Sequence, residues 1–145
     1  MSIHQIYKQL VPADILTEVL NQVEADPDWV KDNGIAPLRL YTTIIKFPKI
    51  KEIVDKTFPE LELKIENKIY FQKYPVGGVC KDHIDPTRIT VVILIQEPDR
   101  GGFLSVEGTE AYLKAGDAIM FDGTDHHKMT PVLRGQRISL ALWFK

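Results

Sequence analysis

The chain has 145 residues, a length that suits one domain with one hydrophobic core. Its net charge of −2 gives no sign of binding to nucleic acid or to an anionic membrane, and no apolar run approaches transmembrane length. The N-terminus lacks the layout of a signal peptide, and a single cysteine excludes an internal disulfide framework. We therefore expect a cytoplasmic, intracellular protein with no nucleic-acid or membrane partner.

The first 60 residues predict a helical support region. Apolar residues recur at helical spacing over 12–26, between a proline near the start and the Asp-Pro pair that closes the segment. A second, shorter helix is expected over 48–58. The segment 38–47 between them is rich in β-branched and aromatic residues, which predicts a strand.

From residue 61 to residue 145 the pattern becomes that of strands. Apolar and polar residues alternate over 61–74, whereas 89–95 is apolar at every position but one, as in a strand covered on both faces. Turns rich in Gly, Pro and Asp then separate short strands over 103–106, 118–122 and 137–144. This succession predicts an antiparallel barrel or jelly roll as the core of the domain, with the helices packed outside.

The last predicted strand has two unlike faces. One face is apolar and is expected to pack against the helices: Ile138, Leu140, Leu142 and Phe144. The other face is small or polar near its start: Arg137, Ser139, Ala141 and Trp143. The second face would make a poor core, so it is a candidate for the floor of a pocket.

A candidate metal site begins with His83 and Asp85, which lie on the same face if this segment is extended. With one histidine from a distant strand, they would form the two-histidine, one-carboxylate triad that suits non-haem Fe(II) and leaves positions open. The adjacent His126 and His127 both remain open for that role, although neighbouring strand residues face opposite ways and only one can point inward.

Each feature also has an ordinary structural interpretation. A lone His-x-Asp is usually a surface turn, a histidine pair after a turn is most often exposed, and a lone arginine is most often a surface cation. The order and spacing of the features together favour the functional interpretation.

The C-terminal half of the chain resembles the Fe(II)- and 2-oxoglutarate-dependent dioxygenases, in the prolyl-4-hydroxylase-like branch. The matching pieces are YP at 74–75, GG at 77–78, HID at 83–85, GGFL at 101–104, GDAIMF at 116–121, HKMTPV at 127–132, RIS at 137–139 and Trp143. This resemblance implies a double-stranded β-helix, which agrees with the predicted strand succession. It also implies Fe(II) and 2-oxoglutarate, with ascorbate as a further candidate cofactor.

The resemblance carries specific roles to residues of this chain. It makes His83, Asp85 and His127 the metal ligands, with His127 favoured over His126 because the family tail places the ligand four residues before a proline. It implies that Arg137 binds the far carboxylate of 2-oxoglutarate through its planar fork, with Ser139 as a second donor. Tyr74 matches a tyrosine of the cosubstrate pocket, and a plain core or rim aromatic is the equal alternative.

Two positions depart from the family pattern. Many relatives have an aromatic residue where this chain has Cys80, and Ile95 occupies the expected place of a pocket tyrosine. The hydrogen bonding to 2-oxoglutarate is therefore expected to differ in detail from that of these relatives.

The expected activity is hydroxylation of an unactivated C–H bond with O₂ and 2-oxoglutarate, releasing succinate and CO₂. The leading substrate is a protein or peptide, with a prolyl residue first. The alternatives are a free amino acid or other small molecule, and a non-catalytic module that only binds metal or 2-oxoglutarate. The loop 26–39 is the best candidate to cover the substrate, with Trp29 and Arg39 as contacts.

Overall fold

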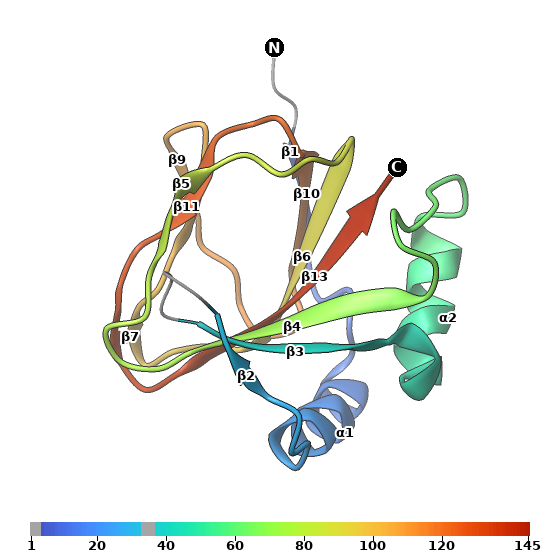
Figure 1. The fold of residues 1–145 in the computed structure, drawn as a ribbon, viewed down its shortest axis with the longest axis horizontal. Coiled ribbons are helices and arrows are strands. Elements are labelled where there is room, and N and C mark those ends of the chain that lie inside the picture. The colour runs from blue at the N-terminus through green and yellow to red at the C-terminus, as the bar shows by residue number, and fades with distance from the viewer. Residues whose placement is uncertain (1–3, 33–36) are drawn as a thin grey trace.

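The computed structural model describes residues 4–32 and 37–145, which form two facing antiparallel sheets with two helices on the outside (Figure 1). The larger sheet has, in spatial order, β1 (His4–Tyr7), β10 (Ala118–Asp122), β6 (Ile89–Gln96), β13 (Arg137–Phe144), β4 (Lys68–Tyr74), β3 (Leu38–Thr43) and β2 (Val30–Lys31). The smaller sheet has β5 (Cys80–His83), β11 (His127–Met129), β8 (Leu104–Val106) and β9 (Thr109–Ala111). A further pair joins β12 (Val132–Arg134) to β7 (Arg100–Gly101).

The helices α1 (Ala13–Glu24) and α2 (Pro48–Thr57) cover the outer face of the larger sheet, and a short 3₁₀ turn, η1 (Ile44–Lys46), precedes α2. Both helices were predicted within a few residues of their observed ends. Their apolar stripes, including the fully buried Val23 and Ile50, pack against strand residues such as Phe71 and Leu140. Among the described residues, neither helix has the length and apolar character needed to cross a membrane.

Strand β13 separates the core from the cavity, as its two-faced pattern predicts. Its apolar set belongs to the main hydrophobic core: Ile138, Leu140, Leu142 and Phe144. The other face looks toward the smaller sheet, because Arg137, Ala141 and Trp143 line the cavity between the sheets. The packing of the apolar face of β13 in the core therefore positions the residues on its other face, which line the cavity.

The prediction of a strand from residue 61 is wrong at its start. Residues 61–67 form loop and turn, with one isolated bridge from Leu63 to Phe144, and the strand begins at Lys68. Asn67 adopts a positive φ of 60°, which breaks an extended strand and which asparagine tolerates better than most residues. The alternation continues into the turn without strand pairing, and Ile65 is left about half exposed.

Candidate active site

The two sheets bring together three side chains from the predicted metal site. His83 ends β5 and His127 begins β11, and the two residues are direct partners in the ladder between these strands. Asp85 lies just beyond β5, where its backbone N–H donates to the carbonyl of Gly123 at 2.7 Å. The histidines thus come from paired strands, and Asp85 comes from the turn that leads into the larger sheet.

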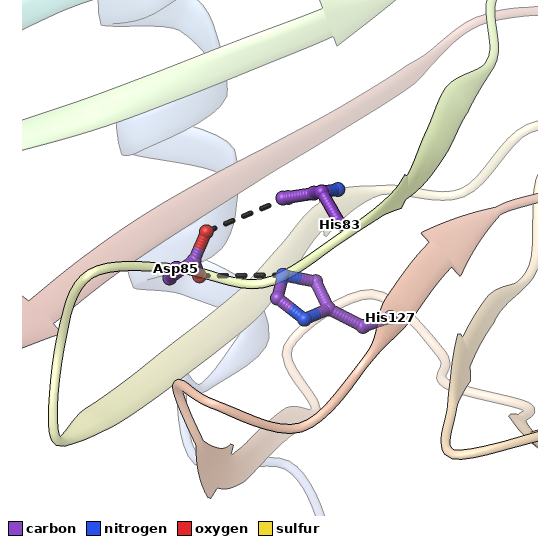
Figure 2. A group of neighbouring side chains, drawn as sticks. All are labelled: His83, Asp85 and His127. Carbon is purple, nitrogen blue, oxygen red and sulfur yellow. Dashed lines mark ion pairs between the residues drawn. The ribbon is translucent and has the colours of Figure 1, made fainter.

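The three side chains converge on one point (Figure 2). His83 Nε2 lies 3.4 Å from Asp85 Oδ1, and His127 Nε2 lies 3.3 Å from Asp85 Oδ2. One ligand atom from each residue lies within 4.8 Å of the others. Ligands that share a metal ion at right angles lie about 3 Å apart, since each is about 2.1 Å from the ion. The cluster therefore fits a single divalent ion.

Backbone carbonyls orient both histidine rings in the same way. The Nδ1 atom of His83 lies 2.7 Å from the carbonyl oxygen of Lys81, and that of His127 lies 2.8 Å from the carbonyl oxygen of Asp125. A carbonyl can only accept, so each Nδ1 carries the proton when the ring is neutral. The Nε2 lone pairs then face Asp85 and are free to bind a metal.

The ionised carboxylate of the cluster favours the binding of a cation. Burial by itself raises the pKa of Asp85, but hydrogen bonds from His127, His83 and Thr90 bring this pKa far below its ordinary value. The hydrogen bond to Asp85 is the main cause that raises the pKa of His83 to about 10. Without metal, His83 therefore keeps a proton toward the Asp85 carboxylate at neutral pH, and a divalent ion that binds there displaces this proton.

Thr90 also belongs to this site, although the sequence analysis did not identify it. Its hydroxyl donates to Asp85 Oδ2 at 2.8 Å and lies 3.0 Å from the hydroxyl of Thr87. Thr90 is 1% exposed. Its position in the sequence could have indicated this role, since Thr90 is the one polar residue in the apolar run 89–95. A buried hydroxyl there needs a hydrogen-bond partner.

A cavity of about 340 Å³ opens from the cluster toward the larger sheet. Its lining includes the three clustered residues together with Tyr74, Arg137 and Trp143. A cavity of this size suits a small dicarboxylate together with part of a second reactant.

Arg137 is a buried cation at one end of this cavity. It is 4% exposed, and its Nη1 donates to the hydroxyl of Ser139 at 3.1 Å. Its guanidinium carbon lies 5.8 Å from the centre of the Tyr74 ring. Within the described residues no carboxylate pairs with it, and burial lowers its pKa. A buried guanidinium without a counter-charge is costly, so this end of the cavity suits an anion.

Two of the other predicted site residues, His126 and Trp29, lie outside the cavity, whereas Arg39 lines it. The His126 side chain is exposed, and its Nδ1 is 3.5 Å from Asp82 Oδ2, outside the cluster. Trp29 does not line the cavity. Its ring packs against the core, and its Nε1 donates to the carbonyl of Val23 at 2.7 Å. Arg39 from the same loop does line the cavity, and residues 33–36 of the loop lie outside the described residues.

Ile95, at the expected place of a pocket tyrosine, does not line the cavity. Ile95 belongs to the core beneath the sheet, whereas Leu94 is the strand partner of Ser139. Adjacent strand residues point to opposite faces, so Leu94 shares the face of Ser139 and Arg137.

Comparisons with known proteins agree with this geometry. Residues 69–145 match the model of the 2OG-Fe(II) oxygenase superfamily. A PKHD-type hydroxylase of Delftia acidovorans is 35% identical over 92 residues, which are 50% of this chain and 41% of that protein. The chain thus spans less than half the length of this curated relative.

Solved structures show the same fold at low sequence identity. A prolyl-4-hydroxylase of Pseudomonas putida matches with a TM-score of 0.75 and 17% identity, over 98% of this chain and 91% of that one. HygX of Streptomyces hygroscopicus, with nickel, 2-oxoglutarate and hygromycin B bound, matches with a TM-score of 0.70 and 11% identity, over 97% and 82%. These matches confirm the predicted jelly-roll architecture.

The family match includes β4, which carries Tyr74, the residues of the metal cluster, and β13, which carries Arg137. It covers more than half of the chain, and the clustered residues fit the Fe(II) of that family. This chain therefore belongs to the 2OG-Fe(II) oxygenase superfamily, whose metal is Fe(II) and whose cosubstrate is 2-oxoglutarate.

Proposed function

We propose that this chain hydroxylates an unactivated C–H bond of a residue within a protein or peptide, with a prolyl residue as the leading target. The observation that carries the proposal is the presence of the His83, Asp85 and His127 cluster and the unpaired Arg137 in one cavity. A dicarboxylate that chelates a metal through one end needs a metal-binding cluster and, in the same cavity, a cation for its other carboxylate.

His83, Asp85 and His127 would hold Fe(II) from one side and leave the cavity side open. With 2-oxoglutarate and O₂, the bound iron supplies the oxidation that places one oxygen atom in succinate, releases CO₂ and places the other oxygen atom in the substrate C–H bond. The protein contributes the position of the reactants and the exclusion of water from them.

Arg137 would bind the far carboxylate of 2-oxoglutarate through its planar fork. Ser139 holds the guanidinium from one side through the hydrogen bond to its hydroxyl. Tyr74 is the strand partner of Arg137, and burial raises the pKa of its hydroxyl above the ordinary value. That hydroxyl therefore stays protonated at neutral pH and can donate to a carboxylate.

The substrate class is inferred from similarity and from the shape of the site. The Pseudomonas putida neighbour is a prolyl-4-hydroxylase, and the segment from Asp85 to β6 contains no long lid. An open rim favours a polypeptide chain. A small-molecule substrate is the second candidate, because the HygX neighbour has hygromycin B bound.

A succinate-coupled screen of peptides and free amino acids tests the proposal, with mass spectrometry of products made under ¹⁸O-labelled O₂. We expect a peptide product that gains one labelled oxygen atom. His127→Ala should abolish metal binding and turnover, and the adjacent, exposed His126→Ala is the matched control that keeps both. Turnover without 2-oxoglutarate, or with free amino acids alone, would contradict the proposal.

A further inference from the structure

Three aromatic side chains form a row across the larger sheet on its cavity face. Tyr41 of β3 is the strand partner of Tyr70 of β4, and their ring centres are 4.3 Å apart. Tyr70 in turn lies 4.6 Å from Trp143 of β13. The three rings therefore form a continuous surface over three neighbouring strands, which lie side by side in Figure 1. We call this surface the aromatic row.

The aromatic row begins at the candidate active site. Trp143 lines the cavity and is the strand partner of Thr90, whose hydroxyl holds Asp85. From β13 to β3 the row crosses two strand spacings, which is about 10 Å. It ends at Tyr41, which is 41% exposed. A molecule bound at the metal site and extending outward along this face would meet the rings in order.

The charges beside the aromatic row are mainly positive. The Arg39 guanidinium lies 5.5 Å from the centre of the Tyr70 ring, and Lys68 Nζ lies 5.5 Å from the centre of the Tyr41 ring. Lys64 and Lys128 line the cavity mouth, where Asp32 is the one acidic residue of the lining besides Asp85.

Asp32 pairs with Arg39 Nη2 at 3.3 Å and leaves Arg39 Nε without a partner among the described residues. Neither Lys64 nor Lys68 has an acidic partner in the part of the chain that the structure describes, and Lys64 Nζ donates to the backbone carbonyl of Pro86. The positive charges of Arg39 and Lys68 beside the row favour an occupant that carries carboxylates.

We propose that the aromatic row is a docking surface for an extended, acidic peptide segment of the substrate. The segment carries a prolyl or aromatic ring about three residues from the hydroxylated position, because three extended residues span about 10 Å. Flat rings on the protein stack with such a ring, and extended peptides commonly bind in aromatic-lined grooves. The inference rests on the proposed function, since it places the hydroxylated residue at the metal site.

Two other occupants fit less well. A small molecule that fills the cavity would leave Tyr41, at the far end of the row, without a contact. Single-stranded nucleic acid also stacks on aromatic side chains, but it requires a positive groove that follows many phosphates. The whole chain has a net charge of −2, and only a few cations flank the row.

Fluorescence anisotropy with labelled nine-residue peptides tests the inference. The protein is loaded with Fe(II) and 2-oxoglutarate without O₂, so that binding is measured without turnover. The peptides have a central proline, carry either phenylalanine or alanine three residues away on each side, and have either acidic or lysine flanks. We expect the acidic peptide with phenylalanine to bind about tenfold more tightly than its alanine or lysine counterparts.

Matched variants locate the binding surface. Tyr41→Ala should remove the advantage of the phenylalanine peptide, and Tyr41→Thr should do the same while keeping β-propensity. Tyr112→Ala is the control, because Tyr112 is also exposed but stacks with Phe103 away from the row. Lys68→Gln should reduce the preference for acidic flanks, whereas Lys56→Gln at the end of α2 should not.

Equal binding by the Tyr41 and Tyr112 variants would overturn the inference, as would stronger binding of an oligonucleotide of similar length. Hydroxylation of peptides without any effect of the Tyr41 variants would leave the proposed function intact and remove the docking surface. Peptide binding that depends on Tyr41, without any hydroxylated product, would support the surface and contradict the proposed function.

Discussion

The Thr90 hydroxyl orients one of the candidate metal ligands, Asp85, through a hydrogen bond. Asp85 has to keep one carboxylate oxygen toward each histidine, and the hydrogen bond from Thr90 to Oδ2 restrains the rotation of the carboxylate. Partners of this kind are typically responsible for a factor of 10–100 in metal affinity.

Thr90→Val keeps the shape of the side chain but loses this hydrogen bond. We expect metal affinity to fall about 10–100-fold, measured by calorimetric titration of Mn(II) or anaerobic Fe(II). Thr90→Ser retains the hydroxyl and should bind nearly as tightly as the parent. Equal affinity for the valine and serine variants would show that Thr90 serves only the packing of β6.

Arg137→Lys tests the anion-binding end of the cavity. Lysine keeps the positive charge but loses the planar fork, so a carboxylate would be left imperfectly paired. We expect 2-oxoglutarate binding to weaken by about 2–5 kcal/mol, with much less effect on metal binding. Titration of both ligands measures the two effects, and Arg134→Lys at the exposed end of β12 is the control. Equal losses of metal and 2-oxoglutarate would assign Arg137 a structural role.

At the scale of elements, strong patterns were predicted well and short polar strands were not. The spans 118–122 and 137–144 coincide with β10 and β13, because each is a mostly apolar run next to Gly and Asp turn residues. Strands β5 and β11 are short and polar, so their sequences do not distinguish them from turns. Their pairing depends on the rest of the sheet, and that pairing brings His83 opposite His127.

The turn that contains Gly123 positions the turn that carries Asp85. A Cβ atom on Gly123 would lie 2.2 Å from Thr87 Oγ1 and 2.3 Å from the Thr87 carbonyl oxygen, so an alanine there must push this turn away. Because the Gly123 carbonyl accepts from the Asp85 N–H, the displacement reaches the metal ligand.

We expect Gly123→Ala to lower metal affinity at least about tenfold and to cost about 1–3 kcal/mol of stability. Gly108→Ala provides the comparison. Gly108 has open space around its Cβ position but a φ of 79°, so alanine there should cost about 1–2 kcal/mol of stability and leave metal binding unchanged. Similar metal affinities for the two variants would contradict the role given to Gly123.

At the scale of the whole molecule, the site depends on contacts between distant parts of the chain. The family resemblance predicted the three side chains that cluster, His83, Asp85 and His127, whereas the residue types and spacing by themselves left His126 and His127 open. The aromatic row was not predicted, because it depends on the register between β3, β4 and β13. Single residues such as Tyr41 and Tyr70 carry no sign of that register in the sequence.

Asp117 is a second long-range connection, between the start of the chain and the strands. Its carboxylate accepts from the backbone N–H of Gln9 at 2.8 Å and of Lys114 at 2.9 Å, and Lys8 Nζ is 3.6 Å away. Burial opposes ionisation of Asp117, but these hydrogen bonds and Lys8 lower its pKa below the ordinary 3.8. The charged carboxylate therefore stabilises the folded state.

This shift determines the pH dependence of stability. A lowered folded-state pKa gives a contribution that is present above 3.8 and is lost as the pH falls through the lower folded-state value. Asp117→Asn places an amide N–H₂ against a backbone donor, so at pH 7 it should lower the free energy of unfolding by about 1.5–3 kcal/mol. The difference from the parent should stay constant down to about pH 5 and shrink below pH 4. Urea unfolding of parent and variant across this pH range measures the difference in the free energy of unfolding.

Asp55→Asn is the control. It removes an exposed carboxylate on α2 and should change stability by less than about 0.5 kcal/mol. If the effect of Asp117→Asn on the free energy of unfolding did not change with pH, the shape of the side chain, and not its charge, would be responsible for the stabilisation.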